Sequence, residues 1–478
     1  MPNSEEVKAY VQNRLSLGAD SLRAMTLDND KKPLPQRSVF LVVNKYLRDF
    51  KLRRAEPRWV AIPGLRGVGK TTLLAQLFDQ VNCHDQHKIY ISLDDATRSL
   101  GANIDDILKA YQNILGTPFE RLTKPVYIFL DEVQYDETWG ATLKNLYDRT
   151  KMVFILCTGS SALSLQSNPD VARRITFTKI YPLSFPEYKM IKDGKYPIPK
   201  LGGELKSAIF ESPDAKTVYD RLNALNEKVL TYWTGIPPKE IISYLRYGTL
   251  PFAVSIDNEP LIYSRINQTL NGILNRDVPQ LNQFDKDTID KLSQILYMVA
   301  SYDQVSFNSI ATSVQLNFKT VTAVFAALEK TDLLIRVYPF GAHETQVRKP
   351  SKYLFMSPAF RAMYYNLVGS IAPDDDYRGK LFEDVVAFYL LRVLTRNGQI
   401  SITHDSAKES ADFVLVNRIQ KKERLVIEAG IGKKGFGQVY KTMERTQAKY
   451  GLVVSASSLS MDADEKIVKV PYKHFLLL

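Results

Sequence analysis

The chain has 478 residues, of which 45% are hydrophobic and 24% are charged, a balance typical of globular domains with buried cores. The polar start MPNSEEVKAY and the lack of a long apolar run argue against a signal peptide and a membrane span, and Cys83 and Cys157 have no metal-ligand spacing. The net charge of +11 favours nucleic acid or another polyanion as a partner, although a large protein can be mildly basic without one. We therefore expect a cytoplasmic protein with no membrane contact, no disulfides and no zinc site.

The first predicted elements are helices. A polar helix extends to about Lys32, Pro33 and Pro35 interrupt the chain, and QRSVFLVVNKYLRDF has a helical pattern. From Arg58 onward, short apolar strands alternate with longer helical segments, in the order RWVAIPG, KIYISLDD, PVYIFLDE and MVFILCTGS. This alternation predicts βαβ units around a parallel sheet, and so an α/β fold.

A glycine-rich loop follows the first strand. Residues 64–71 read GLRGVGKT and match the P-loop pattern G-x-x-x-x-G-K-[ST] at every fixed position. The strand WVAI precedes the loop and the apolar helix TTLLAQLF follows it, which weighs against a chance match in a glycine-rich turn.

This loop predicts a site for ATP and Mg²⁺. Glycines let the backbone wrap a phosphate closely, and the helix N-terminus favours an anion. We expect Lys70 to reach the β- and γ-phosphates and Thr71 to hold Mg²⁺. The expected nucleotide-binding residues are Gly64, Leu65, Arg66, Gly67, Val68, Gly69, Lys70, Thr71 and Thr72.

Two consecutive acids end the strand PVYIFLDEVQ. We expect Asp131 to hold Mg²⁺ through water and Glu132 to act as the general base, which points to hydrolysis; a solvated pair of loop acids is the alternative. After the next strand, Thr158, Ser160 and Ser161 are candidates to contact the γ-phosphate or the attacking water, and Ser160 is assigned to catalysis. Ser161 suits helix capping equally well.

The rest of the chain mixes helices and strands. Four prolines mark a boundary near 180–205, and a helical stretch continues to about Asp285. Residues 286–358 combine short helices with a hairpin-like pair of strands. The turn-rich segment IAPDDDYRGK marks a second boundary, and beyond it a helix at 378–396 precedes the strands FVLVN, RLVIEAG and LVVSA.

Several segments, taken in order, resemble a known family. GLRGVGKTT, IFLDEVQ, LCTGSSA, ARRITFTKIYPLSFPEY and YGTLPFAV are similar to those of prokaryotic AAA-type ATPases, STAND-related P-loop proteins with a winged helix and a C-terminal PD-(D/E)XK nuclease-like domain of the DUF4143 type. The resemblance extends from about residue 36 to the end of the chain. It implies a P-loop NTPase parallel sheet, then a helical and winged-helix region, then a restriction-endonuclease-like α/β domain.

The resemblance also implies how the chain is divided. The expected parts are an N-terminal helical extension (1–35), a P-loop ATPase domain (36–204), a helical lid region (205–285), a winged helix (286–372) and a nuclease-like domain (373–478). Relatives have Gly-Arg before YPLSFPEY, where this chain has Arg173-Arg174. Arg174 is then a candidate γ-phosphate sensor or arginine finger, and the alternative is a surface arginine that binds a neighbouring carboxylate.

The winged-helix segment has a candidate recognition helix, NFKTVTAVFAALEKTDLL. If it reads DNA, Asn317, Lys319 and Thr320 face the major groove. The helix carries few basic residues, however, and phosphate binding needs several cations, so a lid or a protein contact is favoured over DNA readout.

In the nuclease-like domain, the resemblance assigns three carboxylates, Glu383, Asp412 and Glu428, as ligands for one or two Mg²⁺ ions. The family usually places a lysine two residues after the third acid, but this chain has Gly430 there. Lys433, Lys434 and Lys441 are alternative donors, with Lys433 assigned to the possible site. A glycine turn holds an ammonium poorly, so impaired or absent cleavage is favoured. Solvated strand-end acids are the plain alternative.

These observations predict an ATP-hydrolysing switch whose nucleotide state controls a winged helix and a degenerate nuclease-like domain that binds DNA or a protein partner. The first alternative is an ATP-regulated, Mg²⁺-dependent DNase. The second is a non-hydrolysing, ATP-binding scaffold or DNA-binding protein. The pathway, the protein partner and the oligomeric state are left open.

Overall fold

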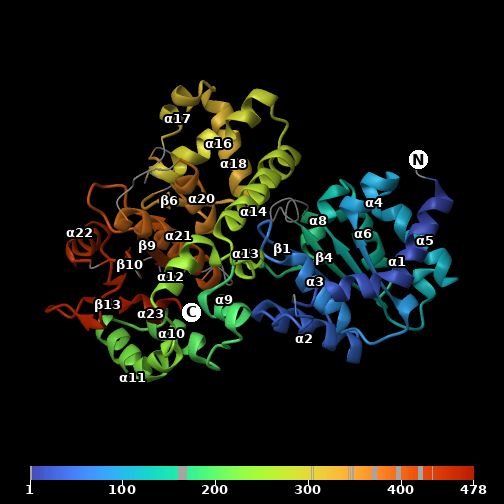
Figure 1. Ribbon diagram of the computed structural model, residues 1–478, viewed down its shortest axis with the longest axis horizontal. Coiled ribbons are helices and arrows are strands. Elements are labelled where there is room, and N and C mark those ends of the chain that lie inside the picture. The colour runs from blue at the N-terminus through green and yellow to red at the C-terminus, as the bar shows by residue number, and fades with distance from the viewer. Residues whose placement is uncertain are drawn as a thin grey trace. The chain divides into compact units, whose positions relative to one another are not determined.

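The structure is a computed structural model that describes residues 3–478 apart from 29, 160–168, 303, 305, 343, 345, 347, 348, 369–373, 395–399, 418–423 and 433. For 17, 169–170, 367–368 and 374–375 it describes the backbone alone. The chain divides into two compact units, Met1–Tyr181 with Lys330–Asp332 and Pro182–Glu329 with Leu333–Leu478 (Figure 1).

The first unit is built on a five-stranded sheet with the order β2-β3-β4-β1-β5, in which all neighbouring strands are parallel. Its strands are β1 (Trp59–Pro63), β2 (Lys88–Ser92), β3 (Val126–Asp131), β4 (Val153–Gly159) and β5 (Thr176–Phe177). The parallel sheet expected from the strand–helix alternation is therefore confirmed. Because β1, β4 and β3 are parallel neighbours, the segments that follow β1 and β3 emerge at the same edge of the sheet with only β4 between them.

Helices cover both faces of this sheet, which is why its strands are almost continuously apolar (Figure 1). The helices are α1 (Ser4–Ala24), α2 (Ser38–Arg53), α3 (Lys70–Asp79), α4 (Leu93–Leu100), α5 (Ile104–Leu115), α6 (Trp139–Arg149) and α8 (Pro169–Ala172). On one face, Val7 and Val11 of α1 share a core with Trp59 and Ile107. On the other, the Phe50 ring of α2 lies 5.7 Å from the Tyr127 ring.

The second unit begins with helices. They are α9 (Phe185–Asp193), α10 (Leu201–Phe210), α11 (Ala215–Trp233), α12 (Lys239–Ser243), α13 (Pro251–Val254), α14 (Glu259–Gly272), α15 (Val278–Leu281), α16 (Lys286–Ser301), α17 (Phe307–Val314) and α18 (Phe318–Lys330), with π-helical turns at Tyr244–Gly248 and Ile273–Asp277. The segment SFPEY forms the N-terminus of α9, where Ser184 and Glu187 form a capping box. The Phe185 ring stacks 4.5 Å from that of Trp233.

An eight-stranded mixed sheet completes the second unit, in the order β12-β13-β11-β10-β9-β8-β6-β7. The strands are β6 (Leu334–Pro339), β7 (Lys352–Phe355), β8 (Ile400–His404), β9 (Phe413–Asn417), β10 (Arg424–Ala429), β11 (Tyr450–Ser455), β12 (Ser460–Met461) and β13 (Ile467–Pro471). The accompanying helices are α20 (Pro358–Val368), α21 (Asp374–Leu394), α22 (Gly437–Thr446) and α23 (Tyr472–Phe475). Val439 and Met443 of α22 pack against Val426 and Val453 of the sheet.

The hairpin β6–β7 is part of this sheet and does not form a separate one. β6 pairs in parallel with β8, where Tyr338 lies opposite Thr403 and Pro339 opposite His404. The backbone N–H of Phe340 extends the pairing with a 2.7 Å hydrogen bond to the carbonyl of His404. The hairpin lies in the segment expected to be a winged helix, and β8 lies in the segment expected to be nuclease-like, so one sheet spans both.

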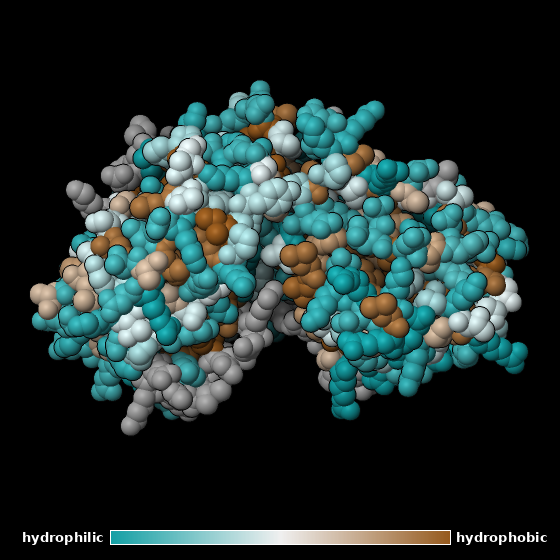
Figure 2. Space-filling model, turned by 90° about the horizontal axis from the view of Figure 1, so that it is seen from below, coloured by the Kyte–Doolittle hydropathy of each residue, from teal (hydrophilic) through white to brown (hydrophobic). Residues whose placement is uncertain are grey.

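Most of the face shown in Figure 2 is hydrophilic, and its hydrophobic side chains form small separate groups. Among the exposed apolar side chains are Leu41 and Leu52 of α2. Of the helices that the structure describes, none combines the length and the hydropathy needed to span a bilayer.

Candidate functional site

The glycine-rich loop lies between β1 and α3, and its backbone explains its glycines. Gly67 and Gly69 have φ values of 87° and 91°, a region that side-chain-bearing residues rarely adopt. At Gly64 the limit is space, because a Cβ atom would lie 2.5 Å from the carbonyl oxygen of Ile180. The loop therefore leaves its backbone free to approach a ligand and touches the segment that ends the first unit.

Lys70 is held by this loop. Its Nζ atom donates hydrogen bonds to the carbonyl oxygens of Gly64, at 3.1 Å, and Leu65, at 3.4 Å. The side chain is buried, and Nζ lies 3.9 Å from Oε1 of Glu132. Lys70 can exchange these neutral carbonyl partners for phosphate oxygens, which are stronger hydrogen-bond acceptors because they are charged.

Asp131, the last residue of β3, accepts three hydrogen bonds. The Thr71 hydroxyl donates to Oδ2 at 2.7 Å, the Tyr90 hydroxyl donates to the same oxygen at 3.2 Å, and the Thr158 hydroxyl donates to Oδ1. Burial and the neighbouring Glu132 charge raise the pKa of Asp131, while the hydroxyls and Lys70 oppose the rise. A hydroxyl and a carboxylate in contact are hard oxygen donors, so this pair fits Mg²⁺.

Glu132 directly follows β3 in a left-handed backbone conformation, with φ 54° and ψ 49°. Such a conformation is uncommon outside glycine and tends to occur at functional sites. The Glu132 backbone N–H donates to the Thr158 hydroxyl at 3.1 Å, and Nε2 of Gln134 donates to Oε2 of its carboxylate. Burial opposes ionisation of Glu132, but Lys70, Gln134 and Arg66 together lower its pKa. The carboxylate is thus ionised and fits the role of a base.

The remaining residues predicted for this site have mixed outcomes. Ser160 and Ser161 lie outside the described residues. Arg174 donates from Nε to Oδ1 of Asp148 on α6 at 2.7 Å, which is the surface ion pair named as the alternative to a sensor role. Leu65 and Val68 are buried, and Arg66, Gly67, Gly69, Thr71 and Thr72 are partly exposed.

Arg37 is a residue near this site that the sequence did not predict. Its Nη1 donates to the carbonyl oxygen of Val68 and its Nη2 to that of Tyr181, both at 2.8 Å. A buried arginine therefore bridges the glycine-rich loop and the last residue of the first unit's main segment. The signal in the sequence was an arginine that directly precedes an apolar helix and follows two prolines.

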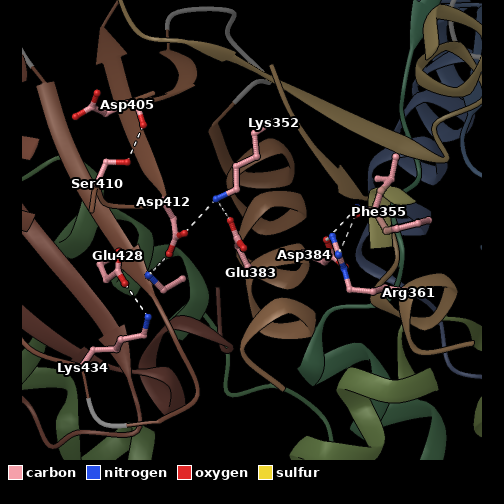
Figure 3. A network of polar contacts seen from close by, with 12 residues as sticks. Lys352, Phe355, Arg361, Glu383, Asp384, Asp405, Ser410, Asp412, Glu428 and Lys434 are labelled. Carbon is pink, nitrogen blue, oxygen red and sulfur yellow. Dashed lines mark hydrogen bonds and ion pairs between the residues drawn. The ribbon is translucent and has the colours of Figure 1, made fainter. Parts of the chain in front are cut away.

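A second cluster lies in the second unit, around a cavity of about 900 Å³ (Figure 3). The three predicted carboxylates all line it: Glu383 projects from α21, Asp412 precedes β9 and Glu428 lies on β10. Burial raises the pKa of Glu383 to about 8 and that of Glu428 to about 7, and the Asp412 charge adds to both shifts. Burial also disfavours the Asp412 carboxylate, but Lys352 and the backbone N–H of Ala429 more than compensate and lower its pKa.

Lys352 of β7 enters this cluster, and the sequence did not predict it. Its Nζ donates to Oδ1 of Asp412 at 3.1 Å and forms an ion pair with Glu383 (Figure 3). The ammonium therefore separates two of the three carboxylates. Among the described residues, no three histidine, cysteine, aspartate or glutamate side chains are grouped so that they could hold a metal ion. The signal in the sequence was a lysine that opens the apolar segment KYLFM.

Lys434 occupies the other side of the cluster. Its Nζ lies 2.8 Å from Oε1 of Glu428 (Figure 3). Lys441, another candidate donor, instead forms an ion pair with Glu409. Lys433, the residue assigned to this site from the sequence, lies outside the described residues.

A buried ion pair orients the elements around this cluster. Nε and Nη2 of Arg361 contact the two carboxylate oxygens of Asp384 at 2.6 and 2.9 Å (Figure 3). Nη1 of Arg361 donates to the carbonyl of Ala300 at 2.6 Å. The Phe355 backbone N–H donates to Asp384 at 2.9 Å. Since Asp384 follows Glu383 on α21 and Phe355 belongs to the same strand as Lys352, this network aligns α21 with β7.

The predicted recognition residues lie at the start of α18. Asn317 caps the helix, because its Oδ1 accepts a 2.7 Å hydrogen bond from the Thr320 backbone N–H. Asn317 and Lys319 are exposed, and Thr320 is partly exposed. Capping explains Asn317 without DNA, and the winged-helix assignment stays a prediction.

Comparison with known proteins agrees with the first site. An AAA domain family matches residues 56–189, the part that contains the phosphate-binding loop and the acid pair. Together with the parallel sheet, this match gives the chain an AAA domain of the P-loop ATPase class. Within that class, it belongs to the family of the uncharacterized protein MJ1637 of Methanocaldococcus jannaschii, to which it is 34% identical over 441 residues, covering 91% of this chain and 87% of that protein.

Other similarities are more limited. Residues 238–368 match a domain of unknown function, DUF8612, and the DUF4143 assignment stays a prediction. The uncharacterized protein MJ1544 of the same organism is 22% identical over 272 residues, 55% of this chain and 52% of that protein. Similar solved structures include a Thermotoga maritima RuvB mutant (14% identity, 71% of this chain, 96% of that chain, TM-score 0.32) and AMPPCP-bound DnaA from Aquifex aeolicus (15%, 62%, 89%, 0.27). Likenesses this weak do not bear on function.

Proposed function

We propose that this protein is an ATP-hydrolysing switch whose nucleotide state controls its C-terminal effector region. The observation that carries the proposal is the arrangement at the edge of the parallel sheet. The Thr71 hydroxyl and the Asp131 carboxylate are in contact, and the ionised Glu132 lies 3.9 Å from Lys70. The glycine-rich loop, the two proposed Mg²⁺ ligands and the proposed base therefore lie around one point at the edge of the sheet.

Each side chain has a distinct role in this proposal. Lys70 leaves the carbonyls of Gly64 and Leu65 to bind the β- and γ-phosphates of ATP. Thr71 and Asp131 would hold Mg²⁺, which supplies charge neutralisation for phosphoryl transfer. Glu132 accepts a proton from the attacking water. We assign Ser160 to contact with the γ-phosphate, and Arg174 to sensing it after release from Asp148.

The loop also contacts the end of the first unit, which supports a switch. Gly64 lies against Ile180, and Arg37 joins Val68 to Tyr181, after which the second unit begins. A shift of the loop on phosphate binding therefore reaches the inter-unit connection directly. Nucleotide would favour one of two populations, as in other NTP-driven switches.

The effector region in this proposal consists of a winged helix at 286–372 and a nuclease-like, PD-(D/E)XK-type domain at 373–478, following a lid at 205–285. Its partner is DNA or a protein, and we expect the protein in the cytoplasm. The test is calorimetry with ATP and Mg²⁺, followed by ATP turnover with and without duplex DNA. Absence of heat on nucleotide addition would reject the site, and tight binding without turnover would favour a scaffold role.

A second candidate function is that of an ATP-regulated, Mg²⁺-dependent DNase. The observation that favours it is that Glu383, Asp412 and Glu428 line one cavity, and that Lys352 and Lys434, which also line it, pair with them. The test is nicking of plasmid DNA with Mg²⁺. Loss of nicking in Glu428→Gln with retention in Lys70→Ala would support it, and an unchanged rate in Glu428→Gln would reject it.

A further inference from the structure

Gly430 stands where the resemblance leads one to expect a lysine. It lies two residues after Glu428, and its backbone N–H donates a 3.0 Å hydrogen bond to the carbonyl of Val454, which continues the pairing of β10 with β11. Side chains two residues apart on a strand lie on the same face. A lysine at this position would therefore have projected along Glu428 into the cavity.

The side chain of Lys434 fills that space instead. A Cβ atom placed on Gly430 would lie 2.4 Å from Cε of Lys434, 3.0 Å from its Cγ and 3.2 Å from its Cδ. The hydrocarbon stem thus passes through the volume of the absent side chain, and Nζ reaches Oε1 of Glu428 at 2.8 Å. Glycine at 430 is what makes this path possible.

The opposite oxygen of Glu428 points to a ligand. Glu428 is 2% exposed and lines the cavity, yet no hydrogen-bond donor in the described part of the chain contacts Oε2. A buried carboxylate oxygen without a partner is costly and marks a site that something else completes. The Asp412 charge acts on Glu428, so the two carboxylates are near each other, and a divalent cation between them would give Oε2 its partner without Glu383, which is paired with Lys352.

We propose that Lys434 replaces the missing lysine and contacts the scissile phosphate of a nucleic-acid substrate. This inference rests on the DNase candidate of the proposed function. In the reaction, water forms a new P–O bond, the ester P–O bond breaks, and the proton that the water loses is balanced by one that the leaving oxygen gains. Lys434 neutralises charge on the non-bridging oxygens and is not consumed.

The experiment compares Lys434→Met and Lys434→Arg with Lys441→Met, which removes the lysine paired with Glu409. A relocation variant, Gly430→Lys with Lys434→Ala, restores a lysine at the usual position. Plasmid nicking with Mg²⁺, Mn²⁺ affinity by calorimetry and the melting temperature are measured on each full-length protein. ATP turnover of the same preparations monitors the first unit.

We expect Lys434→Met to nick at least about 10²-fold more slowly, because an electrophilic or acid group typically contributes that much. Its Mn²⁺ affinity and melting temperature should not fall, since Glu428 and Asp412 remain. Lys441→Met should match the wild type, and the relocation variant should recover nicking.

Three results would overturn the inference. A Lys434→Met variant that nicks at the wild-type rate would show that the ammonium is not needed. Parallel loss of nicking, Mn²⁺ binding and stability would show that Lys434 only supports Glu428. Absence of nicking by the wild type itself would remove the DNase candidate and this inference together, while intact ATP turnover would leave the switch standing.

Discussion

Nζ of Lys70 lies 3.9 Å from Oε1 of Glu132, so the cation expected to bind phosphate faces the carboxylate expected to activate water. Burial opposes ionisation of Glu132, and the Lys70 charge is the largest effect that lowers its pKa. A phosphate that draws Lys70 away weakens this effect, and the carboxylate then becomes a stronger base. We therefore expect nucleotide binding and activation of Glu132 to be coupled through this contact.

This coupling predicts opposite phenotypes for the two residues. Lys70→Ala should weaken ATP binding by about tenfold or more, since a charge-assisted hydrogen bond is lost. Glu132→Gln should bind ATP normally and hydrolyse it about 10²–10⁴-fold more slowly. Calorimetry and phosphate release measure the two effects, with Lys124→Ala, an exposed lysine of the same unit, as the control. Equal turnover in all of these proteins would reject both assignments.

Gly64→Ala should damage the same site without removing a functional group. Its Cβ atom would lie 2.5 Å from the Ile180 carbonyl oxygen, so the loop or the Ile180 segment must shift. We expect a lower ATP affinity and a lower melting temperature. In Gly18→Ala, where a Cβ meets no atom within 4 Å, helix propensity should instead stabilise α1 by about 0.5–1 kcal/mol. Unchanged ATP affinity in Gly64→Ala would contradict the proposed close fit.

The Arg361–Asp384 pair should show strong non-additivity. Arg361→Met or Asp384→Leu alone should destabilise the second unit by about 3–5 kcal/mol, because each leaves a buried partner without its opposite charge. Combining Arg361→Met with Asp384→Leu should recover much of that loss. Scanning calorimetry of the singles and the double variant measures the coupling, and purely additive losses would refute it.

His474 should make the second unit sensitive to acid. Burial lowers its pKa from 6.5 to about 4, and neither ring nitrogen has a hydrogen-bond partner among the described residues. The unfolded state therefore binds more protons than the folded state between these values. The neutral His474 ring therefore contributes to the free energy of unfolding above pH 6.5, and this contribution, up to about 3 kcal/mol, is lost as the pH falls toward 4.

The measurement is unfolding at pH 7 and pH 4.5 for the wild type and His474→Leu. Carboxylates titrate in both proteins, so the difference between them isolates the histidine. The variant should lose less stability on acidification, and identical losses would show that folding does not lower the pKa of His474.

The candidate phosphate site could be predicted from the sequence because its information is local. Eight consecutive residues specify the loop, and the strands that carry it have unbroken apolar runs. Asp131 and Glu132 could be placed beside it because parallel strands present their carboxyl ends at one edge.

The contacts that the sequence did not reveal are non-local. Lys352 meets Asp412 across 60 residues, and Arg37 meets Tyr181 across 144. Such contacts depend on strand pairing and helix placement that no periodicity encodes. The sequence also made Gly430 look like a defect, because the stem of Lys434 over it becomes visible only in three dimensions.

The pairing of β6 with β8 has an evolutionary consequence. A gene fusion that joined a foreign C-terminal region after α20 would strip Tyr338 and Pro339 of their neighbours and leave a bare strand edge prone to aggregation. It would also leave Lys352 behind, away from Glu383 and Asp412. The smallest segment that recombination can exchange intact thus starts upstream of the hairpin, so the hairpin and the carboxylates are expected to be inherited together.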